Sequence, residues 1–167
     1  YFRMGKCLWE TGDFGAAKER FFKARELDTL RFRVDNRINT IIRETAAKDQ
    51  NKDVIMVDAE KAFEKASPVG IPGDELFYEH VHMNFNGNYV LAASMFLKIR
   101  DIMPAWIKKK ARECPEQTLI PIGQCQKLLA YTGWDRFNLG YDVLHNYIMK
   151  PPYSNQLYHD KRVQRLE

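Results

Sequence analysis

Apolar residues recur every three or four positions along most of the chain, which is the spacing of one face of an α-helix. Near the start, this spacing occurs on both sides of a turn at Gly12-Asp13. The apolar and small positions after the turn are Phe14, Ala17, Phe21 and Ala24. The pattern predicts a helical hairpin over residues 1–29.

The next segment combines a helical pattern with a strand-like one. Residues 30–48 predict an amphipathic helix. Val54-Ile55-Met56-Val57 is short, β-branched and almost wholly apolar, as a strand buried on both faces of a sheet would be. We find no second good strand, so its partners in a parallel sheet would lie outside these residues. The expected apolar face of the helix is Val34, Ile38, Ile41 and Ile42.

After Met103-Pro104 the pattern is helical again. Thr132 to Asp135 resembles a capping box, and an apolar face follows it through Phe137, Tyr141, Leu144 and Ile148. The predicted fold class is therefore mainly α, in three parts. These are the hairpin (1–29), a small α/β piece with one buried strand and flanking helices (30–103), and a helical C-terminal region (104–167).

The stretch from Glu79 to Asn88 carries the candidate chemistry. It holds His80 and His82, two of only four histidines in the chain. A carboxylate hydrogen-bonded to one ring nitrogen of an imidazole fixes the tautomer and stabilises the imidazolium, while the other nitrogen takes a proton. Glu79 and His82 are the candidate catalytic pair, and His80 and Asn84 are candidate binding residues. From the residues alone, a histidine that satisfies loop backbone groups remains the alternative.

A metal site is a weaker interpretation of the same loop. Glu79, His80 and His82 would need a distant ligand such as His145 or His159. Three cysteines occur, an odd number without metal spacing. We predict no metal and no cofactor.

Composition indicates a globular chain, with 45% hydrophobic and 29% charged residues. The net charge of +4 is mild, and we interpret the basic clusters as solvated helix faces rather than a nucleic-acid surface. No apolar run approaches the roughly 18 residues that span a bilayer. The chain begins Tyr1-Phe2-Arg3-Met4, so we expect a fragment of a longer protein; nothing indicates its cellular location. The basic clusters are Lys108–Lys110 and Lys161, Arg162 and Arg165.

The N-terminal hairpin resembles a tetratricopeptide repeat (TPR). The positions that carry the resemblance are Tyr1, Met4-Gly5, Leu8, Gly12-Asp13-Phe14, Ala17, Phe21, Ala24 and Leu27. The resemblance implies a module for protein–protein interaction with further repeats beside it. An ordinary helical hairpin is the alternative.

The central stretch resembles the last conserved block of the SGNH (GDSL-type) hydrolases. That block reads Asp-x-x-His and then a glycine that opens a helix. The resemblance implies that His82 is the catalytic histidine, Glu79 the triad acid and Gly87 the helix-opening glycine. Glu stands where the family has Asp, and Met83 where it commonly has Pro. The family's Gly-Asp-Ser nucleophile block has no match, because Ser67, Ser94 and Ser154 all lie in other contexts.

Two functions follow as expectations. One is part of an SGNH-type esterase or acetylesterase that hydrolyses small esters or acetylated sugars, with its nucleophile outside this chain; the isolated chain would be inactive. The alternative is a non-enzymatic helical-repeat scaffold that binds a protein or peptide partner.

Overall fold

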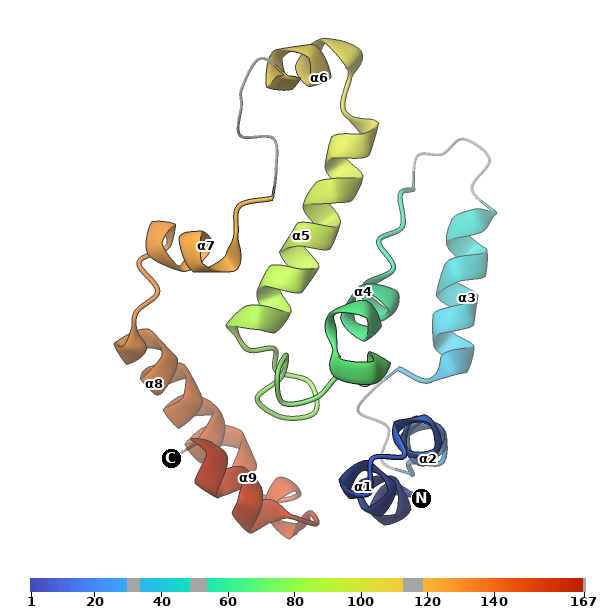
Figure 1. Cartoon of the computed structure of the whole chain (residues 1–167), viewed down its shortest axis with the longest axis vertical. Coiled ribbons are helices and arrows are strands. Elements are labelled where there is room, and N and C mark those ends of the chain that lie inside the picture. Colours follow the sequence, from blue (N-terminus) through green and yellow to red (C-terminus); the bar gives the residue numbers. More distant parts are fainter. Residues whose placement is uncertain (30–33, 49–53, 113–118, 167) are drawn as a thin grey trace.

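The computed structural model describes residues 1–29, 34–48, 54–112 and 119–166, which are mainly helical (Figure 1). The α-helices in these ranges are α1 (Phe2–Glu10), α2 (Phe14–Glu26), α3 (Asn36–Ala47), α4 (Ala59–Ala66), α5 (Phe85–Ile102), α6 (Ala105–Arg112), α7 (Ile122–Leu128), α8 (Gly133–Val143) and α9 (His159–Leu166). Shorter helical segments are η1 (Pro68–Gly70), the π-helical η2 (Leu144–Ile148) and η3 (Tyr153–Asn155).

Helices α1 and α2 form a closely packed hairpin. Ala17 of α2 is completely buried. Gly5 of α1 lies against Phe21, and a Cβ at Gly5 would come within 2.8 Å of that ring. Asp13 caps α2, because its carboxylate accepts a hydrogen bond from the backbone N–H of Ala16 at 3.1 Å. Small residues at the contact therefore set the approach of the two helices.

The prediction of a buried strand at Val54–Val57 is wrong, and with it the small α/β piece. The segment is irregular chain that leads into α4, and the described residues contain no β-strand. Val54 and Ile55 are 60% and 43% exposed. A strand buried on both faces needs neighbouring strands and covering helices, so β-branched composition alone does not create one.

The amphipathic helix predicted after the hairpin forms as α3, but its apolar face is not covered. Asp35 caps the helix by accepting a hydrogen bond from the N–H of Ile38 at 2.9 Å. Ile38, Ile41 and Ile42 are each about half exposed. Residues 30–33 of the predicted helix lie outside the described residues.

Ion pairs join α2, α3 and α4. The guanidinium of Arg43 donates to both carboxylate oxygens of Asp58 at 2.9 and 3.0 Å, and to Glu60 at 2.7 Å. Arg25 of α2 donates to the other oxygen of Glu60 at 3.0 Å. These bonds from Arg43 lower the pKa of Asp58 to about 2. The start of α4 is thereby fixed to the helices on both sides.

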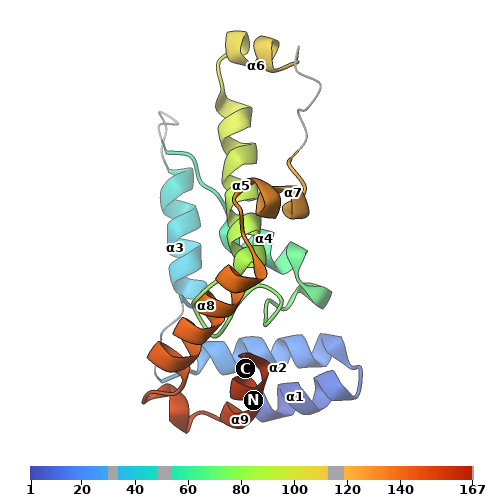
Figure 2. The ribbon, with the colours of Figure 1, turned by 90° about the vertical axis from the view of Figure 1, so that its left-hand side faces the viewer.

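The C-terminal region contributes the main buried apolar cluster of the described residues. Val143, Leu144 and Ile148 are buried, and Tyr78 packs against them from the central loop. Figure 1 and Figure 2 together show α9 beside the α1–α2 hairpin, with the start of α9 nearer to α1 than the C-terminus is. There the Tyr158 ring lies 6.2 Å from the Phe2 ring, centroid to centroid. Within the described ranges, no helix is both long and apolar enough to cross a membrane.

Candidate functional site

Residues 76–84 form a short hairpin-like loop before α5. The N–H of Tyr78 donates to the carbonyl of His82 at 2.8 Å, and the N–H of Asn84 donates to the carbonyl of Leu76 at 3.0 Å. Phe77 and Met83 face each other in an isolated antiparallel bridge. The loop therefore holds Glu79 and His82 at its tip, close together.

The Glu79 carboxylate is the buried centre of this tip, with a side chain only 2% exposed. Its Oε1 accepts hydrogen bonds from the backbone N–H of His82, at 2.7 Å, and from Nδ1 of the same residue. Its Oε2 accepts from the N–H of Val81 at 3.1 Å and contacts Nδ1 of His80. A carboxylate only accepts hydrogen bonds, so Nδ1 of His82 carries the proton.

The electrostatic balance at Glu79 favours the charged carboxylate. Burial alone would raise its pKa, because desolvation penalises the anion. The backbone and ring hydrogen bonds from His82, the N–H of Val81 and the charge of His80 outweigh this effect. The net result is a Glu79 pKa below its ordinary value, so the carboxylate is ionised at neutral pH.

His82 turns its other ring nitrogen away from the carboxylate. Its side chain is 41% exposed, and no hydrogen bond to Nε2 occurs among the described residues. An imidazole with a protonated Nδ1 and a bare, accessible Nε2 can accept a proton from a hydroxyl or water. The structure thus brings together the predicted base and its orienting acid; their catalytic role stays a prediction.

No serine of the chain completes a triad with this pair. The Oγ of Ser94 donates to the carbonyl of Val90 at 2.7 Å within α5. The Oγ of Ser67 is buried without a hydrogen-bond partner among the described residues. Neither of them, nor Ser154, hydrogen-bonds to His82 in the described structure.

Asn84, predicted as a binding residue, caps α5. Its side-chain oxygen accepts from the N–H of Gly87 at 3.1 Å, and its Nδ2 donates to the carbonyl of Asp74 at 3.2 Å. A Cβ on Gly87 would lie 2.3 Å from the carbonyl oxygen of Leu76. Glycine is therefore required here for α5 to begin directly beneath the loop.

Residues from the C-terminal region lie at the loop, and none of those described here was predicted to belong to the site. Tyr147 and Tyr153 lie against the His82 and His80 rings, at centroid distances of 4.5 and 4.8 Å. Their spacing along the chain gave no signal, because the contacts span more than 60 residues. Also at the loop are Arg162 and Arg165 of α9.

These two arginines belong to the basic cluster predicted to be a solvated helix face, of which Arg165 is exposed and Arg162 is partly buried. Arg162 is half-buried and donates to Oε1 of Gln156 at 2.8 Å. Burial lowers the pKa of Arg162, and the charge of Glu79 opposes that shift. Arg165 donates to the carbonyl of Tyr78 and forms an ion pair with Asp74. Lys161 is also exposed.

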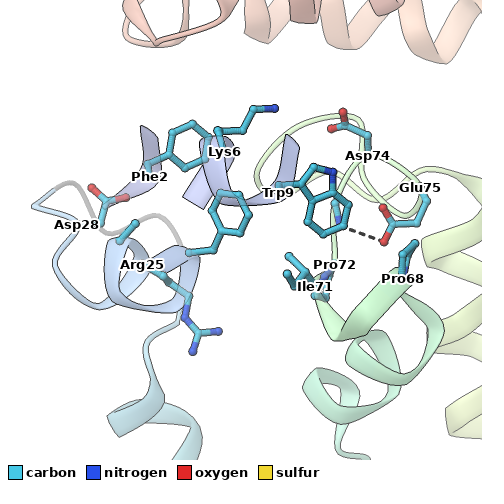
Figure 3. Close-up of a pocket in the computed structure, with 13 residues that line it drawn as sticks. Phe2, Lys6, Trp9, Arg25, Asp28, Pro68, Ile71, Pro72, Asp74 and Glu75 are labelled. Carbon is cyan, nitrogen blue, oxygen red and sulfur yellow. Dashed lines mark hydrogen bonds between the residues drawn. The ribbon is translucent and has the colours of Figure 1, made fainter. Parts of the chain in front are cut away.

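A cavity of about 610 Å³ lies elsewhere, between the α1–α2 hairpin and residues 68–75 (Figure 3). Glu75 is on its wall, whereas Glu79 and His82 are not among the residues that line it. In Figure 3, Arg25 points away from the cavity, in keeping with its bond to Glu60. The apolar lining includes Phe2, Trp9, Phe21, Ala24, Pro68, Ile71 and Pro72.

Metal ligation has no support in the described residues, which contain no group of three or more His, Cys, Asp and Glu side chains placed to hold an ion. His145 instead donates from Nδ1 to the carbonyl of Tyr141 at 2.9 Å. Nδ1 of His159 is buried and has no hydrogen-bond partner among the described residues.

Comparisons with protein-family models, with curated proteins and with solved structures found no match to this chain.

Proposed function

We propose that this chain supplies the general base and its orienting acid to an SGNH-type ester hydrolase whose nucleophilic serine lies outside these 167 residues. One observation carries the proposal: a buried, ionised carboxylate binds Nδ1 of His82, whose side chain is 41% exposed and whose Nε2 has no hydrogen-bond partner among the described residues. The order of Glu79, His82 and Gly87 along the chain, which resembles the family's last block, supports the same interpretation.

The proposed reaction is acyl transfer to water. The serine Oγ bonds to the ester carbonyl carbon while its proton moves to Nε2 of His82, and the carbonyl oxygen becomes an oxyanion. When the carbon–oxygen bond to the alcohol breaks, Nε2–H protonates the departing oxygen. Water then attacks the acyl-enzyme carbon, gives its proton to His82, and the serine leaves with that proton.

Glu79 acts throughout by holding the ring. Its carboxylate accepts the Nδ1–H bond and stabilises the imidazolium that forms after each proton transfer. The donors that stabilise the oxyanion belong, like the serine, to residues outside this chain.

The test is hydrolysis of a short-chain aryl ester by the natural full-length protein. His82→Ala should lower kcat/KM by about a hundredfold or more, because it removes the general base. His145→Ala is the matched control, since His145 also packs against a tyrosine but meets a backbone carbonyl. Activity on several aryl esters that is equal in wild type and His82→Ala would contradict the proposal.

A second candidate is a helical-repeat scaffold that binds a peptide or protein. The α1–α2 hairpin beside an aromatic-lined cavity favours it. A Gly-Asp-Ser-like block after a strand in preceding chain would support the hydrolase, and preceding helical repeats without such a block would support the scaffold.

A further inference from the structure

The C-terminal region surrounds the Glu79–His82 loop although the two are 60 or more residues apart in sequence. Tyr147 of η2 lies against the His82 ring, and Tyr153 of η3 lies against the His80 ring. Arg165 of α9 bonds to the carbonyl of Tyr78, directly before Glu79. Three successive elements thus reach the same loop, each at a different residue.

The contact between Tyr147 and His82 is the one that bears on chemistry. A single hydrogen bond at Nδ1 holds one atom of the imidazole but leaves the ring free to tilt, and a large tilt takes Nδ1–H out of line with the carboxylate that fixes the tautomer. The Tyr147 ring, 4.5 Å away with an interplanar angle of 50°, restricts this tilt from one side. The direction of Nε2 is therefore set jointly by the carboxylate and by the aromatic ring.

Tyr147 is 41% exposed, but the backbone that carries it is anchored on both sides. Leu144 and Ile148 flank it in η2 and are 3% and 1% exposed, so the backbone that carries Tyr147 is fixed in the main buried cluster. Tyr78 of the loop packs against the same cluster. The loop and η2 consequently share one piece of core, and the tyrosine holds its place relative to His82.

We infer that Tyr147 is a positioning residue for His82, which sets the plane of the imidazole so that Nε2 faces the reacting hydroxyl. The inference rests on the proposed function for its catalytic consequence, but its structural part concerns only the ring. The aromatic face also favours the imidazolium formed during proton transfer, through a cation–π interaction. The phenol oxygen has no part in either effect, so phenylalanine should replace tyrosine here.

The first arm of the test reads the ring directly and needs no activity. Nitrogen chemical shifts of the histidine rings at roughly pH 8, above the ordinary imidazole range, report which nitrogen carries the proton. Wild type and Tyr147→Phe should show His82 mainly in the Nδ1–H form. Tyr147→Ala should show a mixture of the two tautomers. Tyr141→Ala, which removes the tyrosine that stacks on His145, is the matched control and should leave His82 unchanged.

The second arm measures ester hydrolysis by the full-length protein. Tyr147→Ala should lower kcat about tenfold, because a misdirected base loses part of the benefit of orientation. KM should change less than about twofold, since the residue acts through His82 rather than on substrate. Tyr147→Phe should restore kcat to near the wild-type value.

The outcomes separate the inference from the proposed function. Wild-type His82 shifts in Tyr147→Ala, or equal impairment in Tyr147→Phe and Tyr147→Ala, would overturn the positioning role. If Tyr147→Ala loses the Nδ1–H preference at His82 but the wild-type full-length protein hydrolyses no ester, the positioning role is upheld and the hydrolase proposal is contradicted. Should Tyr147→Ala fail to fold, Tyr147→Val, whose short side chain also leaves the space beside the imidazole open, must show the same tautomer mixture.

Discussion

His82 and His145 both pack against tyrosines and bond through Nδ1, yet their surroundings differ in one respect. The His82 ring lies against Tyr147, tilted by 50° at a centroid distance of 4.5 Å, and bonds to the buried carboxylate of Glu79. His145 stacks on Tyr141 at 3.9 Å and bonds to a backbone carbonyl on an exposed helix face. Ring contact and hydrogen bonding are thus common to both, and only His82 has a charged partner.

The difference shows what turns a packed histidine into a candidate base. A neutral carbonyl can fix a tautomer, but it gives little stabilisation to the imidazolium that follows proton transfer. An ionised carboxylate fixes the tautomer and also stabilises the imidazolium. His145 is therefore an internal reference, and the variants below either make the two sites alike or change one of them alone.

The largest effect should come from Glu79→Gln, which gives His82 a neutral partner like that of His145. We expect kcat/KM for a short-chain aryl ester to fall by about 10²- to 10⁴-fold in the full-length protein, because the amide does not stabilise the imidazolium and can favour the wrong tautomer. Glu44→Gln, at an exposed position of α3, is the control. A Glu79→Gln enzyme within threefold of wild type would show that the carboxylate has no such role.

Gly87→Ala should have the next-largest effect, because it displaces the loop that carries His82 and leaves His145 in place. The new Cβ would stand 2.3 Å from the carbonyl of Leu76, so backbone must shift. We expect the free energy of unfolding in urea to fall by about 2 kcal/mol or more. Gly133→Ala is the matched control, since a Cβ there meets nothing within 4 Å. Equal stabilities for the two variants would contradict this account of the loop.

Thr132→Ala should have a smaller effect. It changes the start of α8, the helix that leads to His145, and leaves the His82 loop unaltered. Thr132 and Asp135 form a capping box at the start of α8, with hydrogen bonds of 2.7 and 3.3 Å. Its loss should cost about 1 kcal/mol in the free energy of unfolding, measured by denaturant titration. Ester hydrolysis per folded molecule should stay at the wild-type rate; a fall in that rate would mean that α8 also controls the His82 site.

The smallest effect is a difference in acid sensitivity. Glu79 has a lower pKa folded than unfolded, so its charge contributes stability above the unfolded value, and that contribution is lost as pH falls through the folded value. The free energy of unfolding should therefore fall more steeply with acid below about pH 4.5 in wild type than in Glu79→Gln. Identical slopes would mean that the carboxylate titrates alike in both states.

The sequence could predict the contact within the loop because that contact is local. A glutamate three residues before a histidine can reach both the ring and the backbone N–H of that residue, whatever surrounds the loop. The same holds for the cap at Thr132, whose side chain bonds to the N–H of the residue three positions ahead. Short-range geometry of this kind follows from spacing alone.

The remaining features depend on which distant segments meet, and local patterns do not encode that. Tyr147 and Arg165 contact the loop, but their positions in the sequence do not predict these contacts. The apolar face of α3 predicted a helix correctly but not what covers it, and the composition of Val54–Val57 predicted a strand where the described chain forms no sheet. In this chain, the local preference of a segment for helix or strand does not determine which other segments pack against it.

The exposed faces of α3 and of the segment before α4 also bear on how the chain responds to heat and denaturant. Apolar surface that already contacts water in the folded state does not contribute to the area newly exposed on unfolding. That area is therefore smaller than in a chain of the same length whose apolar residues are buried. The heat-capacity change should then fall below the usual value of about 12–15 cal/mol/K per residue. The unfolding transition should accordingly be broad, and folded stability should vary little between a cold room and body temperature.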